Sequence, residues 1–228
     1  MMPSRAWLPL ALLALAACGR DDPAPVAGTA PADPAPVVAT PPPAAPAEAS
    51  TRLDASVVAG NDTLATLQAR HGADNAVAGK VPGAEGTEFD GWVLFPGDPT
   101  RRVYLYVDEA SGGPGAARVL DRESAWERAD GIRMGLTLAE LAARNGAPVG
   151  FVGFDWDYGG GVTGFNGGKL QDQAGSGAIV LCPPEGEFAD MEGYPSGDSE
   201  FDSTNAWVVA HPPVVCEFSV DLAAAEGG

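Results

Sequence analysis

A ten-residue segment occurs twice in this chain. TLATLQARHG at 63–72 and TLAELAARNG at 137–146 are identical at seven positions. Each copy begins with a threonine suited to cap a helix, continues with apolar residues at helical spacing, and ends with a glycine suited to stop the helix. Thr137 and Glu140 also have the spacing of a capping box. The first copy has no glutamate at the corresponding position. Self-similarity of this kind indicates a duplicated structural unit.

Each predicted helix is followed by two aromatic-rich runs joined by a turn. In the first copy the runs are EFDGWVLFPGD and RRVYLYVDE, and in the second they are VGFVGFDWDY and VTGFNGGKL, joined by GGG. Such pairs predict antiparallel hairpins. AARVLDRES, SGAIVLCP and PPVVCEFSVDL are further strand-like runs. We therefore predict an α+β fold in which two related helix-plus-antiparallel-hairpin units, 53–130 and 131–222, form a sheet with helices on one face, ahead of a short tail at 223–228.

The N-terminus has the pattern of a targeting signal. Arg5 precedes the apolar run AWLPLALLALAA, which leads into Leu15-Ala16-Ala17-Cys18. That run is too short to span a membrane as a stable helix. Its end resembles the lipobox of bacterial lipoproteins. The resemblance implies a signal peptide at 1–17, cleavage before Cys18 and acylation of that cysteine, including with palmitate. Gly19 stands where an aspartate would mark inner-membrane retention, so we expect an outer-membrane anchor facing the periplasm. The alternative is an ordinary secretory signal with an incidental cysteine.

Residues 18–52 are dominated by proline and alanine. A segment of this composition cannot bury enough apolar surface to offset the entropy lost on ordering. Proline favours the extended polyproline II conformation, so we interpret the segment as a disordered, semi-stiff tether between the lipid and the folded part. The alternative is a proline-rich ligand for a partner domain.

The chain is strongly acidic, with 31 Asp and Glu against 13 Lys and Arg and a net charge of −18. No basic patch exists for phosphates, so the composition argues against binding to nucleic acid or, through the domain surface, to anionic lipid. It suits a cationic partner or divalent ions. Cys182 and Cys216 are the two cysteines that follow Cys18. In an oxidising compartment we expect them to form a disulfide.

Catalytic motifs are scarce. The two histidines are His71, at the end of the first predicted helix, where a structural role is expected, and His211, before a pair of prolines. No nucleophile-elbow motif or reactive-cysteine setting is present. Two suitably spaced carboxylates would suffice for glycoside hydrolysis, but nothing in the sequence selects a pair among 31 acids. We therefore predict no catalytic residues, and a hydrolase or carbohydrate-active protein stays open as an alternative.

The segment FVGFDWDYGGGVTGFNGGK invites several interpretations. On a strand, Asp155 and Asp157 would share one face and could bind calcium, while Phe154, Trp156 and Tyr158 would share the other. The long acidic segment at 183–206 could also bind calcium, although it lacks EF-hand spacing. The glycines lack the spacing of a phosphate-binding loop. Comparison with the first unit favours a turn between two strands.

Part of the second unit resembles known proteins. Gly135, Thr137, Leu141, Gly146 and Pro148, followed by an aromatic hairpin, resemble the G-x-T-x-x-x-[VL]-x-x-x-x-G-x-P unit of SmpA/BamE-type outer-membrane assembly lipoproteins. They also resemble the tandem unit of beta-lactamase inhibitory protein. The match covers about 35 residues per unit, and the first copy lacks the proline. Residues 131–170 resemble a group of bacterial secreted proteins without an assigned activity. In the two better-known families such units bind other proteins.

These observations predict a lipid-anchored cell-envelope protein that acts as a binding module for a protein partner. Tryptophan and tyrosine are frequent in binding surfaces. The predicted partner-binding residues are Trp92, Phe154, Trp156 and Tyr158. The alternatives are an envelope hydrolase that uses acidic residues and a calcium-stabilised structural module.

Overall fold

The computed structural model describes residues 51–171 and 176–222. The predicted signal peptide, Cys18, most of the proline-rich segment and the tail at 223–228 lie outside these residues, so their roles stay predictions. Within the described ranges, no helix has both the length and the apolar character needed to cross a membrane.

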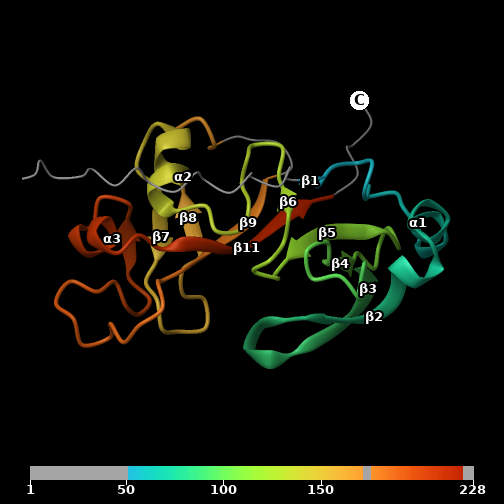
Figure 1. The fold of residues 1–228 in the computed structure, drawn as a ribbon, viewed down its shortest axis with the longest axis horizontal. Coiled ribbons are helices and arrows are strands. Elements are labelled where there is room, and N and C mark those ends of the chain that lie inside the picture. The colour runs from blue at the N-terminus through green and yellow to red at the C-terminus, as the bar shows by residue number, and fades with distance from the viewer. Residues whose placement is uncertain (1–50, 172–175, 223–228) are drawn as a thin grey trace, which may run out of the picture. The chain divides into compact units, whose positions relative to one another are not determined.

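The largest element is an antiparallel sheet of six strands in the order β2-β3-β4-β5-β11-β9 (Figure 1). Its strands are β2 (Ala76–Pro82), β3 (Glu88–Leu94), β4 (Val103–Val107), β5 (Pro114–Val119), β9 (Ser176–Cys182) and β11 (Val214–Asp221). The first four form a meander, in which each strand pairs with the next one along the chain. β11 then pairs with both β5 and β9. The predicted hairpin in the first unit is confirmed as β3 and β4.

A second sheet has three strands, β10 (Glu200–Asp202), β7 (Gly150–Val152) and β8 (Val162–Gly164), in that order. A bridge between Gly161 and Val180 joins this sheet to β9, and the amide of Leu181 donates to the carbonyl of Gly160 at 2.9 Å. The strands β7, β8, β9 and β11 are therefore also neighbours in space, although β10 and α3 come between β9 and β11 along the chain. The α+β class is confirmed, but the two predicted hairpins lie in two joined sheets rather than in one.

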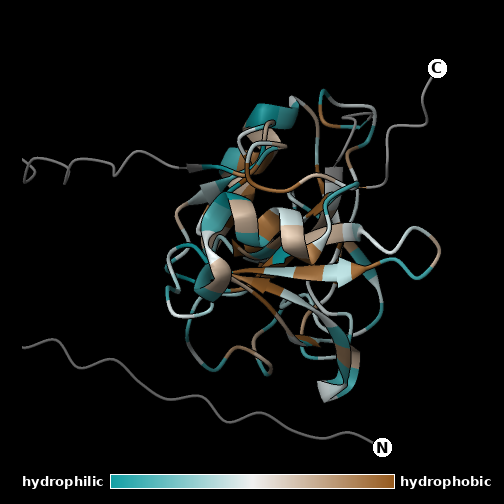
Figure 2. Ribbon diagram, turned by 90° about the vertical axis from the view of Figure 1, so that its right-hand side faces the viewer, coloured by the Kyte–Doolittle hydropathy of each residue, from teal (hydrophilic) through white to brown (hydrophobic). Residues whose placement is uncertain are grey.

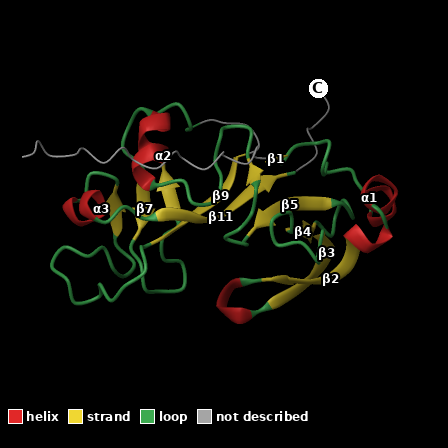
Figure 3. Ribbon diagram, in the orientation of Figure 1, coloured by secondary structure: helices red, strands yellow, loops and turns green. Residues whose placement is uncertain are grey.

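Both predicted helices are present, α1 (Leu64–His71) and α2 (Leu138–Asn145). Thr63 and Thr137 cap them, and each helix has a complete capping box. The hydroxyl of Thr66 takes the place of the missing glutamate in the first box, which the sequence did not predict. The remaining elements are the helix α3 (Ala206–Ala210; Figure 3), the short turns η1 (Ala73–Asn75) and η2 (Ala84–Gly86), and a parallel pair of β1 (Thr51–Arg52) with β6 (Trp126–Glu127).

Both units contribute to one hydrophobic core. Leu67 of α1 and Leu141 of α2 are fully buried in the same cluster as Leu105 of β4 and Phe218 of β11. Figure 2 shows apolar residues along the strands in the middle of the fold. Burial of such side chains from water is the main favourable contribution to folding.

Two strand predictions need correction. The strand predicted through residue 158 ends at Val152, and at Asp155 the backbone turns into the left-handed region at φ 63°. The alternation predicted for residues 154–158 is therefore wrong. Residues 183–206, predicted as a long acidic loop, contain the strand β10 and lead into α3.

Candidate binding groove

A groove with a volume of about 540 Å³ lies between the tips of two hairpins. Its floor comes from neighbouring strands and includes Arg118 of β5, Glu217 of β11 and Val180 of β9. One wall is the tip of the β2–β3 hairpin at 83–85, and the other is the β7–β8 loop at 157–159. The β2–β3 hairpin projects toward the bottom of Figure 1. The groove therefore combines residues of both repeated units.

A hydrogen-bonded network fixes the floor. Arg118 pairs with Glu217, with 2.9 Å between Nε and Oε1, and its Nη1 donates to the hydroxyl of Tyr106 at 2.9 Å. Tyr106 in turn donates to the carbonyl of Pro82, at the base of the hairpin tip. Burial raises the pKa of Tyr106 and outweighs the opposing effect of Arg118, so the hydroxyl stays protonated and remains a donor. The network thus ties one wall of the groove to the middle of the sheet.

The glycines of the β7–β8 loop allow the other wall to pack tightly. Gly160 has φ +78°, and a Cβ added to it would collide with the carbonyl oxygen of Leu181. A Cβ on Gly159 would meet backbone atoms of the same loop. The side chain of Trp156 closes the loop by donating to the carbonyl of Gly153 at 2.9 Å. The prediction that GGG forms a turn is confirmed.

The exposed aromatic side chains of the described residues all lie at these two tips. Phe89 is 55% exposed, and a Cβ on Gly83 would meet its ring, so it lies beside the first wall without lining the groove. Tyr158 is 60% exposed in the second wall, and Trp156 packs edge-on against it, with 5.4 Å between ring centroids. Exposed aromatic residues that gather around a concave site are typical of a binding surface.

The predicted partner-binding residues divide into two groups. Trp156 and Tyr158 are exposed beside the groove. Trp92 is half-buried and packs against the core. Phe154 is 2% exposed and lies between Phe151 and Tyr194, so its assignment to a binding face is wrong.

Phe89 is an exposed residue that the sequence interpretation missed. In EFDGWVL it reads as an ordinary strand aromatic, and only its place next to the hairpin tip exposes it.

Asp155 and Asp157 do not share a face. Asp157 lines the groove, whereas Asp155 lies beside the hydroxyl of Tyr194. Burial and then the neighbouring Asp155 raise the pKa of Tyr194 to about 12, so this tyrosine is neutral at physiological pH. Over residues 51–171 and 176–222, no three acidic, histidine or cysteine side chains gather as a metal site would require. The two carboxylates of the predicted calcium pair therefore have different surroundings.

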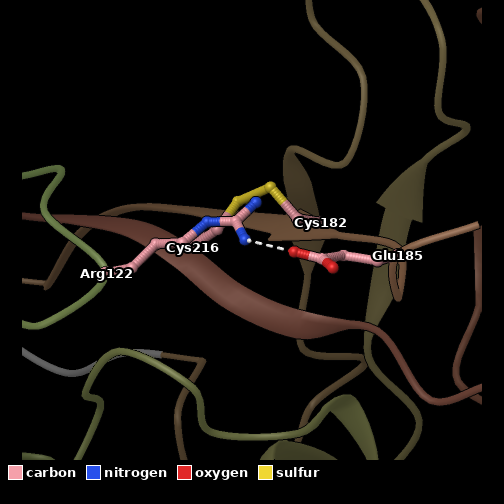
Figure 4. Close-up of a disulfide and its surroundings, with 4 residues drawn as sticks. All are labelled: Arg122, Cys182, Glu185 and Cys216. Atoms are coloured by element: carbon pink, nitrogen blue, oxygen red, sulfur yellow. Dashed lines mark hydrogen bonds and ion pairs between the residues drawn. A yellow bond between two sulfur atoms is a disulfide. The ribbon is translucent and has the colours of Figure 1, made fainter.

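The predicted disulfide between Cys182 and Cys216 is present, with 5.7 Å between the Cα atoms (Figure 4). It links the neighbouring strands β9 and β11, at a bulge in β11. The bond joins the two ends of the segment between β9 and β11, which contains β10 and α3. Arg122 and Glu185 form an exposed ion pair nearby at 3.3 Å, beside a pocket of about 180 Å³. An exposed pair of this kind contributes little stability.

Both histidines have structural contacts. His71 ends α1, where its Nε2 lies 2.7 Å from the carbonyl of Val57 and its ring packs against Phe95. This confirms the structural role expected at the helix end. His211 caps α3 and stacks on Trp207, with 4.7 Å between ring centroids.

A scan against protein-family models, a search of curated proteins and a search of solved structures each gave no match to the chain. The groove and its surroundings are therefore the basis for a functional hypothesis.

Proposed function

We propose that this chain is a lipid-anchored protein of the bacterial cell envelope whose folded part binds a partner protein in the groove between its two hairpin tips. The observation that carries the proposal is the gathering of Phe89, Trp156 and Tyr158 at those tips. Burying aromatic surface at a concave site is a frequent source of binding energy in protein interfaces.

The rigidity of the groove supports binding. Arg118, Glu217 and Tyr106 hold one another in place, and the second wall is held by backbone contacts to β9. A preformed site loses less conformational entropy on association than a flexible one.

The carboxylate on the floor of the groove is not free for acid catalysis. Glu217, the carboxylate on its floor, accepts hydrogen bonds from Nε and Nη2 of Arg118. These bonds commit Glu217 to the network that shapes the groove. A catalytic carboxylate would have to be available to a substrate.

Photo-cross-linking in the producing cells tests the binding site. p-Benzoylphenylalanine placed at Tyr158 should capture a discrete envelope protein on irradiation. The same group at Val209, an exposed apolar position on α3 outside the groove, serves as the matched control. Equal capture from both positions, or none from Tyr158, would argue against the proposal.

The anchor is tested separately. The Cys18→Ser variant should lose labelling by radioactive palmitate. Its folded part should keep the thermal unfolding midpoint of the wild type. Undiminished labelling of the variant would contradict the lipid anchor.

A further inference from the structure

We infer that the groove accepts a basic side chain, lysine or arginine, presented by a loop of the partner protein. This inference rests on the proposed function and specifies the chemistry of the partner.

The groove carries an excess of negative charge. Glu85, Asp157 and Glu217 contribute carboxylates, and among the described residues Arg118 is the one basic residue of its lining. Arg118 directs Nε and Nη2 to Glu217, and Nη1 to Tyr106 and Pro82, so its charge is committed inside the network. Neither Glu85 nor Asp157 forms an ion pair within the described ranges. Both residues line the open groove, one on each wall, and a cation between them would be attracted to both.

The remaining surface of the groove suits a long side chain that ends in a charge. Val180, Val162 and Val152 give part of the lining an apolar surface along which an aliphatic stem can lie. The exposed ring of Tyr158 lies next to Asp157 in the sequence and lines the same wall. A cation over an aromatic ring gains energy in addition to its attraction to a carboxylate. Lysine and arginine combine the apolar stem and the charged end that this surface fits.

The surroundings favour a protein loop over a free cation. Phe89 and Trp156 are exposed at the tips but do not belong to the lining of the groove. A small cation inside the groove would leave both rings in water, whereas a protein loop could cover them. The net charge of −18 also attracts a basic partner and accelerates the encounter.

The test uses two disulfide-cyclised peptides as probes, one with lysine and arginine at its turn and one with glutamates at the same positions. Binding is followed through the amide resonances of the ¹⁵N-labelled folded protein. The basic peptide should shift amides in the 157–162 loop and near Glu217, and its affinity should fall as salt is added. The acidic peptide should leave these resonances unchanged.

Neutral variants give the second measurement. The double variant Asp157→Asn with Glu85→Gln should bind the basic peptide about tenfold more weakly, as expected for the loss of two partly screened charges. The double variant Glu109→Gln with Asp190→Asn removes the same charge from exposed positions outside the groove and should bind as the wild type does. Thermal unfolding of both variants checks that the fold is intact.

Several outcomes would overturn the inference. The first is that the acidic peptide shifts the same amide resonances as the basic one, and the second is that the basic peptide shifts resonances outside the groove. The third is that the Asp157→Asn, Glu85→Gln variant binds the basic peptide as tightly as the wild type does. The fourth is that spermidine binds as tightly as the basic peptide, which would indicate a site for free cations. Cross-linking at Tyr158 in the Asp157→Asn, Glu85→Gln background separates this inference from the proposed function. Undiminished capture of the partner there would refute the role of the charges but leave the binding site in place, whereas failure of the wild type to cross-link would refute the site itself.

Discussion

The two repeated units both begin with a helix followed by a hairpin, but they build the hairpin differently. In each, four strands after the helix are neighbours in space, β2 to β5 in the first unit and β7, β8, β9 and β11 in the second, where β10 and α3 come between β9 and β11. In the first, β2 and β3 pair in full register over seven residues each and end in the short turn η2. In the second, β7 and β8 have three residues each and are separated by a glycine-rich loop. The order of elements therefore does not determine how long a hairpin becomes.

The helices are also anchored differently at equivalent positions. Before α2, Leu136 and Leu141 are both fully buried at the two positions of a hydrophobic staple. In α1, Asp62 stands at the position that corresponds to Leu136 and forms a bidentate ion pair with Arg70, at 2.7 Å for both contacts. The N-terminus of α2 is thus held by apolar packing, and the N-terminus of α1 by an ion pair with a nearly buried carboxylate. Substitutions in the two units would show whether these differences in their hairpins and helix anchors affect stability.

The largest expected effect concerns the disulfide, which links two strands of the second unit. Replacing both Cys182 and Cys216 by alanine should lower the free energy of unfolding by about 3–4 kcal/mol, because the bond closes a long loop in the unfolded chain. Urea denaturation measures this loss. Wild-type protein treated with dithiothreitol serves as the control and should unfold at the same urea concentration as the variant. A loss of less than about 1 kcal/mol would show that the segment between β9 and β11 is stabilised by the packing of its side chains and does not need the disulfide.

The next effect compares a glycine from each hairpin tip. Gly160→Ala should cost about 3 kcal/mol, because it combines a left-handed backbone with a collision against the carbonyl of Leu181. Gly86→Ala should cost only about 1 kcal/mol, since Gly86 has φ +72° but open space around it. Thermal unfolding of the two variants gives the comparison. Equal losses would mean that the second tip is not held against β9.

The repeated segment was the most informative part of the sequence. Its caps and apolar spacing predicted helices over 63–72 and 137–146, and the structure has them at Leu64–His71 and Leu138–Asn145. These signals are local, since a cap and a helical stripe depend on residues only a few positions apart. The disulfide was predictable for another reason, because only two cysteines follow Cys18.

The features that sequence alone did not reveal depend on distant contacts. β2, with the sequence AVAGKVP, contains glycine and lysine and lacks a clear alternation, yet it pairs with β3 along its full length. The turn at Asp155 and the burial of Phe154 depend on backbone contacts with Pro195 and Gly197, about 40 residues away. The groove could not be located because its walls belong to different units, although Tyr158 and Trp156 were recognised as binding candidates.

The third prediction concerns the charged anchor of α1. Burial raises the pKa of Asp62, but hydrogen bonds from Arg70, Ala59 and Thr66 outweigh it and hold the pKa below the ordinary value of 3.8. Arg70→Met removes the cation and leaves a nearly buried carboxylate, which should lower the free energy of unfolding by about 2 kcal/mol at neutral pH. This is less than for a fully buried pair because the side chain of Arg70 is 33% exposed.

The pH dependence of this loss identifies its cause. A carboxylate whose pKa is lower in the folded state than in the unfolded state stabilises the fold above the unfolded value, and the stabilisation disappears as the pH falls through the folded value. The difference between the wild type and Arg70→Met should therefore shrink as the pH is lowered below about 4. Arg144, the equivalent residue of α2, has no ion pair among the described residues, so Arg144→Met should change stability by less than about 0.5 kcal/mol at any pH. If urea denaturation gave a loss for Arg70→Met that stayed constant down to acidic pH, then the hydrogen bond of Arg70 to the carbonyl of Val57 or the packing of its aliphatic stem, and not its pairing with Asp62, would anchor α1.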